Sequence, residues 1–156
     1  MKKSLLPCAL ALTLFFPAAA IIRAQGNPAP KEEKAHAEPD TELGKTMEKL
    51  NGAWRKLRKQ VNDPTANASS IEQVTIVKEL SEKAATLQPD KTKDLPEADR
   101  AKFVQGYQEK MKEFSAKLDK LSAAFKANDN TSAAAILKEI SQLQRESHKE
   151  YKRPDK

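Results

Sequence analysis

Cysteine is nearly absent from this chain. The 156 residues include a single cysteine, Cys8, which lies in an apolar stretch close to the N-terminus. Without cysteine, the remainder of the chain can form no disulfide, no zinc site with thiolate ligands and no iron–sulfur cluster. It also offers no thiol for a covalent thioether link, so any prosthetic group of the folded domain must be held non-covalently.

Histidine is also scarce, and this argues against several classes of enzyme. The chain has two histidines, His36 and His148, so a hydrolytic triad or a catalytic zinc site lacks its parts. A di-metal bundle of the ferritin type would need paired Glu-x-x-His motifs that face inward. Glu146 precedes His148 by two residues rather than three, and no second motif exists. The sequence therefore predicts a protein that is not an enzyme.

The N-terminal segment has the pattern of a secretory signal peptide. Lys2 and Lys3 form a basic start, residues 5–22 are apolar and include two prolines, and Ala24 offers a small residue for cleavage. This pattern predicts a cleavable signal peptide over residues 1–24, rather than a membrane anchor, and export to the periplasm.

Charge and composition change after this segment. Residues 1–24 contain three basic residues and no acidic one, so their removal lowers the net charge of the chain from +6 to +3. No remaining stretch combines clustered Lys and Arg with interleaved aromatic residues, so no nucleic-acid partner is predicted. Residues 25–40 contain prolines and charges but no apolar periodicity, which predicts a flexible leader. His36 lies in this leader, where a histidine is usually solvated.

Four amphipathic stripes fill the rest of the chain. In each stripe the apolar residues recur at steps of three and four, which places them on one face of a helix. No stretch shows the alternation of a β-strand, and no internal repeat is present. The stripes are Leu43, Met47, Leu50, Trp54, Leu57 and Val61; Ile71, Val74, Val77, Leu80, Ala84 and Leu87; Phe103, Tyr107, Met111, Phe114, Leu118, Leu121 and Phe125; and Ala133, Leu137, Ile140, Gln144, Ser147, His148 and Tyr151, with Ile136 and Leu143 beside the last.

Capping and turn residues separate the stripes. Asp40 or Thr41 can cap the first helix, and Ser70 with Gln73 looks like a capping box for the second. Pro96 suits the first turn of the third helix, after a polar loop over residues 89–95. Asn130 or Thr131 is the expected cap of the fourth helix.

Four helices of similar length with short connections predict an all-α fold, an antiparallel up-down-up-down four-helix bundle over residues 41–153. A long coiled-coil hairpin is the alternative. The breadth of the stripes and the proline-marked turns favour the compact bundle.

This topology brings two metal-ligating side chains to one end of the bundle. Met47 lies about two turns into the first helix and His148 about one turn before the end of the fourth, so both should lie at nearly the same height. Phe103 and Tyr107, early in the third helix, belong to that end. The alternative is that the methionine only fills the core and the histidine only interacts with the helix dipole or with solvent.

Three short motifs carry a resemblance to a known family. Met47-Glu48-Lys49-Leu50-Asn51, Phe103-Val104-Gln105-Gly106-Tyr107 and His148-Lys149-Glu150-Tyr151 resemble, in this order, motifs of the cytochrome b562 family. The resemblance spans about residues 41–153. The chain departs from the family in Tyr107, which stands where the family has phenylalanine, and in the spacing of Arg145 before the histidine.

The resemblance implies a cofactor and a function. It implies one haem b per chain, bound non-covalently, with Met47 and His148 as the two axial ligands of the iron and with Phe103 and Tyr107 lining the pocket. It further implies a periplasmic, monomeric electron-transfer protein with a redox partner protein and no membrane association after signal cleavage. The competing class is a haem-free helical bundle with a structural, chaperone or stress role in the cell envelope.

Overall fold

The computed structural model describes residues 41–153 of the chain. The predicted signal peptide and leader, residues 1–40, lie outside the described residues.

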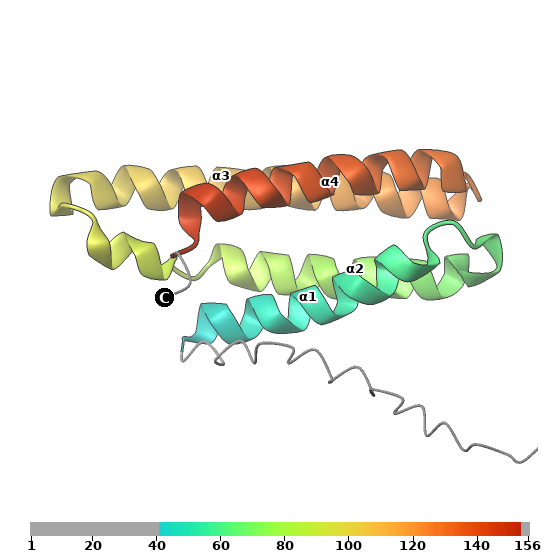
Figure 1. Ribbon diagram of the computed structural model, residues 1–156, viewed down its shortest axis with the longest axis horizontal. Coiled ribbons are helices and arrows are strands. Elements are labelled where there is room, and N and C mark those ends of the chain that lie inside the picture. Colours follow the sequence, from blue (N-terminus) through green and yellow to red (C-terminus); the bar gives the residue numbers. More distant parts are fainter. Residues whose placement is uncertain (1–40, 154–156) are drawn as a thin grey trace, which may run out of the picture. The chain divides into compact units, whose positions relative to one another are not determined.

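Four α-helices form an antiparallel bundle (Figure 1). They are α1 (Glu42–Gln60), α2 (Asn67–Ala85), α3 (Glu97–Lys126) and α4 (Asn130–Tyr151), with two short 3₁₀ helices, η1 (Pro64–Ala66) and η2 (Asp90–Asp94), in the first two connections. Close backbone packing follows chain order, α1 on α2, α2 on α3 and α3 on α4. The described residues contain no strand, and the predicted all-α, up-down-up-down four-helix bundle is confirmed.

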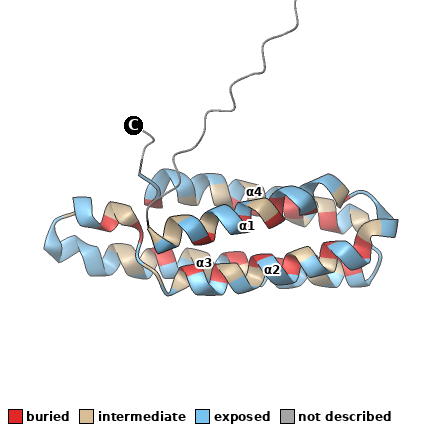
Figure 2. Ribbon diagram, turned by 90° about the horizontal axis from the view of Figure 1, so that it is seen from below, coloured by how far each residue is buried: buried red, intermediate tan, exposed pale blue. Residues whose placement is uncertain are grey.

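The predicted apolar stripes supply most of the core. Figure 2 shows the buried residues concentrated on the sides of the helices that face one another. Trp54, Leu57, Leu118, Phe125 and Ile140 are at most 2 % exposed. Because complete burial of a large apolar side chain contributes about 1.5–3 kcal/mol, this shared core is what holds four amphipathic helices together.

Two of the predicted helix starts are wrong. Helix α2 begins at Asn67, so Ser70 lies inside the helix as a fully buried residue and does not cap it. Helix α4 is capped by Asp129, whose side chain accepts a hydrogen bond from the backbone N–H of Ser132 at 2.9 Å. The prediction of Thr41 as the cap of α1 is confirmed, since its hydroxyl accepts from the N–H of Gly44.

The helices differ in length more than their stripes suggested. Helix α3 has 30 residues against 19 in α1, 19 in α2 and 22 in α4. In addition, the connection predicted as a polar loop over residues 89–95 contains the 3₁₀ helix η2.

The side chains of Asn67, Asn128 and Asn130 form a cluster of hydrogen bonds at the end of the bundle where α1 ends and α2 begins. The Asn67 side chain donates to the side-chain oxygens of Asn128 and Asn130 at 3.0 and 3.1 Å, and Asn130 donates to the carbonyl of Val61 at 2.8 Å. Asn128 has φ 56°, a left-handed conformation that asparagine tolerates better than most residues. The cluster links the turn between α3 and α4 to the connection between α1 and α2.

None of the helices in the described part of the chain is both long enough and apolar enough to cross a membrane.

Candidate functional site

The start of α1 and the end of α4 lie at the same end of the bundle (Figure 1). Met47 lies in the second turn of α1 and His148 in the last turn of α4. The helical bundle thus brings the two predicted ligands to one end, although they are about a hundred positions apart in the chain. Helices α1 and α4 are not among the pairs that pack closely along their length.

Met47 is half-buried. Its side chain packs against the apolar core cluster that includes Leu50, Trp54 and Phe114, and Thr46 beside it is buried. Methionine is unbranched and its thioether has no proton to lose, so its sulfur keeps an available lone pair at every pH. This sulfur can therefore serve as an uncharged metal ligand at the edge of the core.

His148 is exposed, whereas its stripe predicted an inward-facing residue. It lies one helical turn before Tyr151, which is buried. Partial desolvation of the ring, and secondly the positive charge of Lys152, hold the pKa of His148 below its usual value of 6.5. The imidazole is therefore mainly neutral at neutral pH, and the neutral ring is the form that binds metal.

Three aromatic rings pack at this end of the bundle. The ring centroid of Tyr151 lies 5.0 Å from that of Phe103 and 5.6 Å from that of Tyr107. The Tyr107 hydroxyl donates a hydrogen bond to the carbonyl of Ala84 at 3.0 Å, and burial raises the pKa of this hydroxyl. The hydroxyl that distinguishes this chain from the family motif thus links α3 to α2.

Helix η2 connects the two helices that carry the predicted ligands, a role that the sequence did not reveal. The Thr41 hydroxyl donates to a carboxylate oxygen of Asp90 at 2.9 Å, which ties the start of α1 to η2. The Lys91 ammonium donates to the carbonyl of Glu150 at 2.6 Å, which ties η2 to the last turn of α4.

An ion pair strengthens the link to α4. The Arg153 guanidinium donates two hydrogen bonds to the carboxylate of Asp94, one of them from Nε at 2.6 Å. Together with the Thr41 and Lys91 contacts, this ion pair connects Thr41, the residue before α1, through η2 to the end of α4. We call these contacts of η2 the η2 bracket. The density of charged residues in Asp90-Lys91-Thr92-Lys93-Asp94 is the one feature of the sequence that could have indicated it.

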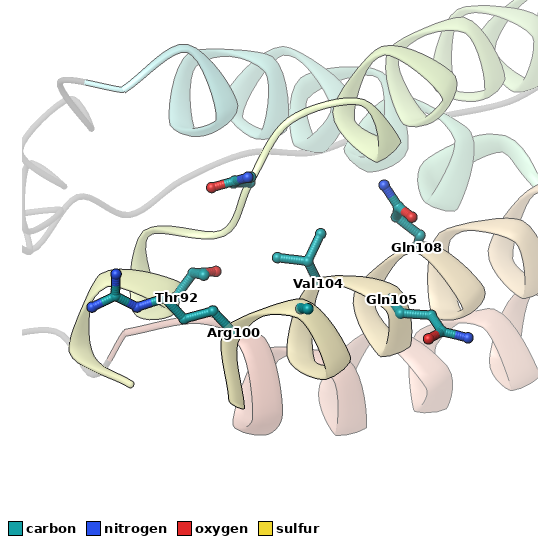
Figure 3. Close-up of a pocket in the computed structure, with 7 residues that line it drawn as sticks. Thr92, Arg100, Val104, Gln105 and Gln108 are labelled. Carbon is teal, nitrogen blue, oxygen red and sulfur yellow. The ribbon is translucent and has the colours of Figure 1, made fainter. Parts of the chain in front are cut away.

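A separate groove lies between η2 and the first turns of α3 (Figure 3). Its volume is about 300 Å³, and its lining is largely polar: Gln88, Thr92, Arg100, Ala101, Val104, Gln105 and Gln108. Neither Met47 nor His148 borders it. A flat, mostly apolar macrocycle needs an apolar lining, so this groove is not the candidate site.

The Met47 thioether and the His148 imidazole, at the end of the bundle where α1 begins and α4 ends, are suitable ligands for a haem. A thioether and a neutral imidazole are a pair that holds haem iron from both sides, and the macrocycle itself supplies the other ligands. The adjoining rings of Phe103, Tyr107 and Tyr151 are suited to pack against an apolar ring system.

These features define a four-helix bundle with a thioether and an imidazole at one end. A model of the cytochrome b562 family matches residues 42–152, and the chain belongs to this family. The family consists of haem-binding electron carriers rather than enzymes, and its haem b is not covalently attached. No curated protein and no solved structure matches the chain.

Proposed function

We propose that this protein is a periplasmic electron carrier that binds one haem b per chain, with Met47 and His148 as the axial ligands. The observation that carries the proposal is the placement of these two side chains at one end of the bundle, on its first and last helices. Family membership independently supports haem as the cofactor.

Each residue of the site has a separate task. His148 would supply a nitrogen lone pair, and its lowered pKa keeps that lone pair free of a proton at neutral pH. Met47 would supply a sulfur that favours the reduced iron and so raises the reduction potential. Phe103, Tyr107 and Tyr151 would exclude water from one part of the pocket.

The bound haem would take up and release one electron. With both axial positions held by protein side chains, the iron would have no open position for oxygen or another small ligand. This arrangement fits electron transfer better than oxygen chemistry. It requires a redox partner protein but no substrate cleft.

The cellular context of the proposal comes from the N-terminal segment. The predicted signal peptide over residues 1–24 supports export to the periplasm. We propose a monomer that is released from the membrane when this segment is cleaved.

Visible spectroscopy of the haem-reconstituted chain tests the ligand assignment. Wild-type protein should show a low-spin spectrum in both oxidation states. Met47→Ala should keep its haem through His148 but become partly high-spin, with a lower reduction potential. His148→Ala should bind haem more weakly than Met47→Ala, because a thioether alone is a weak donor.

Matched controls separate ligation from a general effect of losing the side chain. Met111 is a second half-buried methionine, on α3, and Met111→Ala should leave the low-spin spectrum unchanged. His36 is the other histidine of the chain, and His36→Ala should also change nothing. Low-spin spectra in both Met47→Ala and His148→Ala would refute the ligand pair.

The mode of attachment needs its own test. Because Cys8 is the only cysteine and belongs to the predicted signal peptide, an acid–organic solvent should extract all the haem from the mature chain. Haem that remained on the chain would contradict non-covalent binding. A protein that stays colourless after haem is added would instead favour the haem-free envelope bundle.

A further inference from the structure

The positive charge of the described residues is concentrated on one helix. Helix α1 carries six basic and two acidic residues, a net charge of +4. Residues 41–153 together have a net charge of +5, counted from the sequence. We call the six basic residues the α1 basic face: Lys45, Lys49, Arg55, Lys56, Arg58 and Lys59.

The α1 basic face lacks the ion pairs that neutralise charge elsewhere in the bundle. All six residues are exposed, and none of them forms an ion pair within the described part of the chain. By contrast, Lys78 pairs with Asp119 and Lys117 with Glu139 across helix boundaries. Of the two acids on α1, Glu42 already pairs with Lys83 of α2 at 2.9 Å. The positive charges of these six residues are therefore not neutralised by ion pairs within the described part of the chain, and together they attract a negatively charged molecule that approaches α1.

Four members of the face form a continuous stripe. Lys45, Lys49, Lys56 and Lys59 follow one another at steps of four, seven and three, which keeps them on one side of the helix. Gly52 lies on the same side between Lys49 and Lys56, and a Cβ added there would have no heavy atom within 4 Å. The stripe is thus an open, unobstructed surface.

The α1 basic face lies on the helix that carries the proposed haem ligand Met47, and Arg58 is the member of the face on the same side as Met47. Lys45 and Lys49 precede and follow Met47 by two positions, a step that turns the helix by about 200°, so these two lysines lie on the side of α1 opposite Met47. Arg58 follows Met47 by eleven residues, about three helical turns, and so lies on the same side of α1. A partner that docks on this helix therefore docks on the element that would hold one axial ligand.

We propose that the α1 basic face is the docking surface for an acidic patch on a redox partner protein, an inference that rests on the proposed function. Opposite charges steer two proteins into encounter and can raise the association rate by one to three orders of magnitude. A carrier that must bind briefly and dissociate gains from such attraction, because it accelerates association without a large apolar interface.

The composition of the surface favours a protein over a membrane or a nucleic acid. Every large apolar residue of α1 is at least half-buried, so the helix has nothing to insert between lipid chains. The aromatic residue of α1, Trp54, is 2 % exposed and cannot stack on bases.

The test measures electron transfer from the reduced, haem-loaded chain to hexacyanoferrate(III), an anion of charge −3. One electron passes from ferrous haem to the oxidant, giving ferric haem and hexacyanoferrate(II), with no proton moved. Lys49→Glu/Lys56→Glu should slow this reaction about tenfold at low ionic strength. The difference should shrink as salt screens the charges.

A control of equal charge makes the test specific to position. Lys112→Glu/Lys120→Glu changes the net charge by the same amount on the exposed surface of α3, and it should slow the reaction less than threefold. Tris(bipyridine)cobalt(III), an oxidant of charge +3, should react faster with the α1 variant than with wild type. Equal rates in the two double variants would overturn the docking surface. Failure to bind haem would instead refute the proposed function.

Lipid vesicles provide the other decisive arm. Wild-type protein should not co-sediment with vesicles that contain 30 mol% phosphatidylglycerol at 0.15 M salt. Co-sedimentation that is lost in Lys49→Glu/Lys56→Glu but kept in Lys112→Glu/Lys120→Glu would identify a membrane as the occupant and overturn the protein partner.

Discussion

Gly106 of α3 leaves room for the ring of Tyr151 at the end of α4. A Cβ added at position 106 would lie 2.8 Å from the Tyr151 hydroxyl oxygen, closer than real Cβ contacts allow. Tyr151 cannot easily give way, because Phe103 and Tyr107 pack against its ring. Burial and the neighbouring Glu150 raise the pKa of Tyr151 to about 12. The absent side chain of Gly106 thus leaves the space that the Tyr151 hydroxyl occupies, one helical turn after His148.

We expect Gly106→Ala to destabilise the protein. The added methyl group overpacks a filled site, which typically costs about 1–3 kcal/mol. The higher helix propensity of alanine offsets at most about 1 kcal/mol of this destabilisation. Denaturant unfolding of the apo-protein measures the difference, and an increase in stability would show that Tyr151 is free to move.

Gly52→Ala is the matched control. Gly52 also lies inside a helix, but a Cβ there meets no heavy atom within 4 Å. The same substitution should therefore stabilise the protein by about 0.5–1 kcal/mol through helix propensity alone. Opposite signs for the two variants would separate the packing effect from the effect on the backbone.

Tyr107→Phe should lower stability and leave the haem spectrum unchanged. The substitution removes the hydrogen bond to the buried Ala84 carbonyl, which costs about 0.5–1.5 kcal/mol, but it keeps the aromatic ring. Thermal unfolding and the visible spectrum measure the two effects. A shift to high spin in Tyr107→Phe would mean that the hydroxyl acts on the iron site after all.

Haem affinity should depend on pH through His148. Protonation removes the lone pair that binds iron, so affinity should be constant at high pH and fall by about tenfold per pH unit below the pKa of His148. Since desolvation and Lys152 hold this pKa below 6.5, the fall should begin below pH 6.5. Equilibrium titration of haem against pH measures it.

The same pKa shift has a consequence for folding. The unfolded chain, with the ordinary pKa, binds the proton more readily than the folded chain, so the contribution of His148 to stability is complete above pH 6.5 and is lost as the pH falls through the lowered pKa. Lys152→Gln removes a positive neighbour and should move the loss of haem affinity to higher pH. A shift to lower pH would contradict this origin of the lowered pKa.

Breaking the η2 bracket should accelerate haem loss. Asp94→Asn removes the ion pair with Arg153 that holds the end of α4. Both side chains are about half exposed, at 52 % and 49 %, so solvent screens the pair and we expect the haem dissociation rate to rise only about two- to fivefold. Transfer of haem to a scavenger protein measures this rate.

Glu139→Gln supplies the comparison for the bracket. It breaks another exposed ion pair, Lys117 with Glu139, which joins α3 and α4 away from η2. If the bracket positions α4 for the haem, Glu139→Gln should leave the dissociation rate unchanged. Equal acceleration in both variants would show that any surface ion pair has this effect.

The helices and their order could be predicted from the chain because their cause is local. Apolar residues at steps of three and four mark the buried side of each helix, and the residues so marked include Leu57, Leu118 and Ile140, which are fully buried. The periodicity of apolar residues did not predict the buried positions that small polar residues occupy. Ser70 and Ser81 are buried in α2, and Ser81 satisfies its hydroxyl on the carbonyl of Lys78.

Helix starts were harder to predict, because several residues near a turn can act as caps. Asp129, Asn130 and Thr131 are all suitable residue types, and the geometry of the left-handed Asn128 decides which side chain meets a free N–H.

Sequence alone determined an all-α bundle, the cofactor class through its motifs, and the end of the bundle at which Met47 and His148 lie. Helix periodicity and an alternating topology suffice for these conclusions, because the rise per residue is constant. Only the tertiary structure showed the exposure of His148, the space at Gly106 and the η2 bracket. Each depends on contacts between residues that are far apart in the chain, such as Lys91 and Glu150. No local pattern records such contacts, because they form only when the helices have packed.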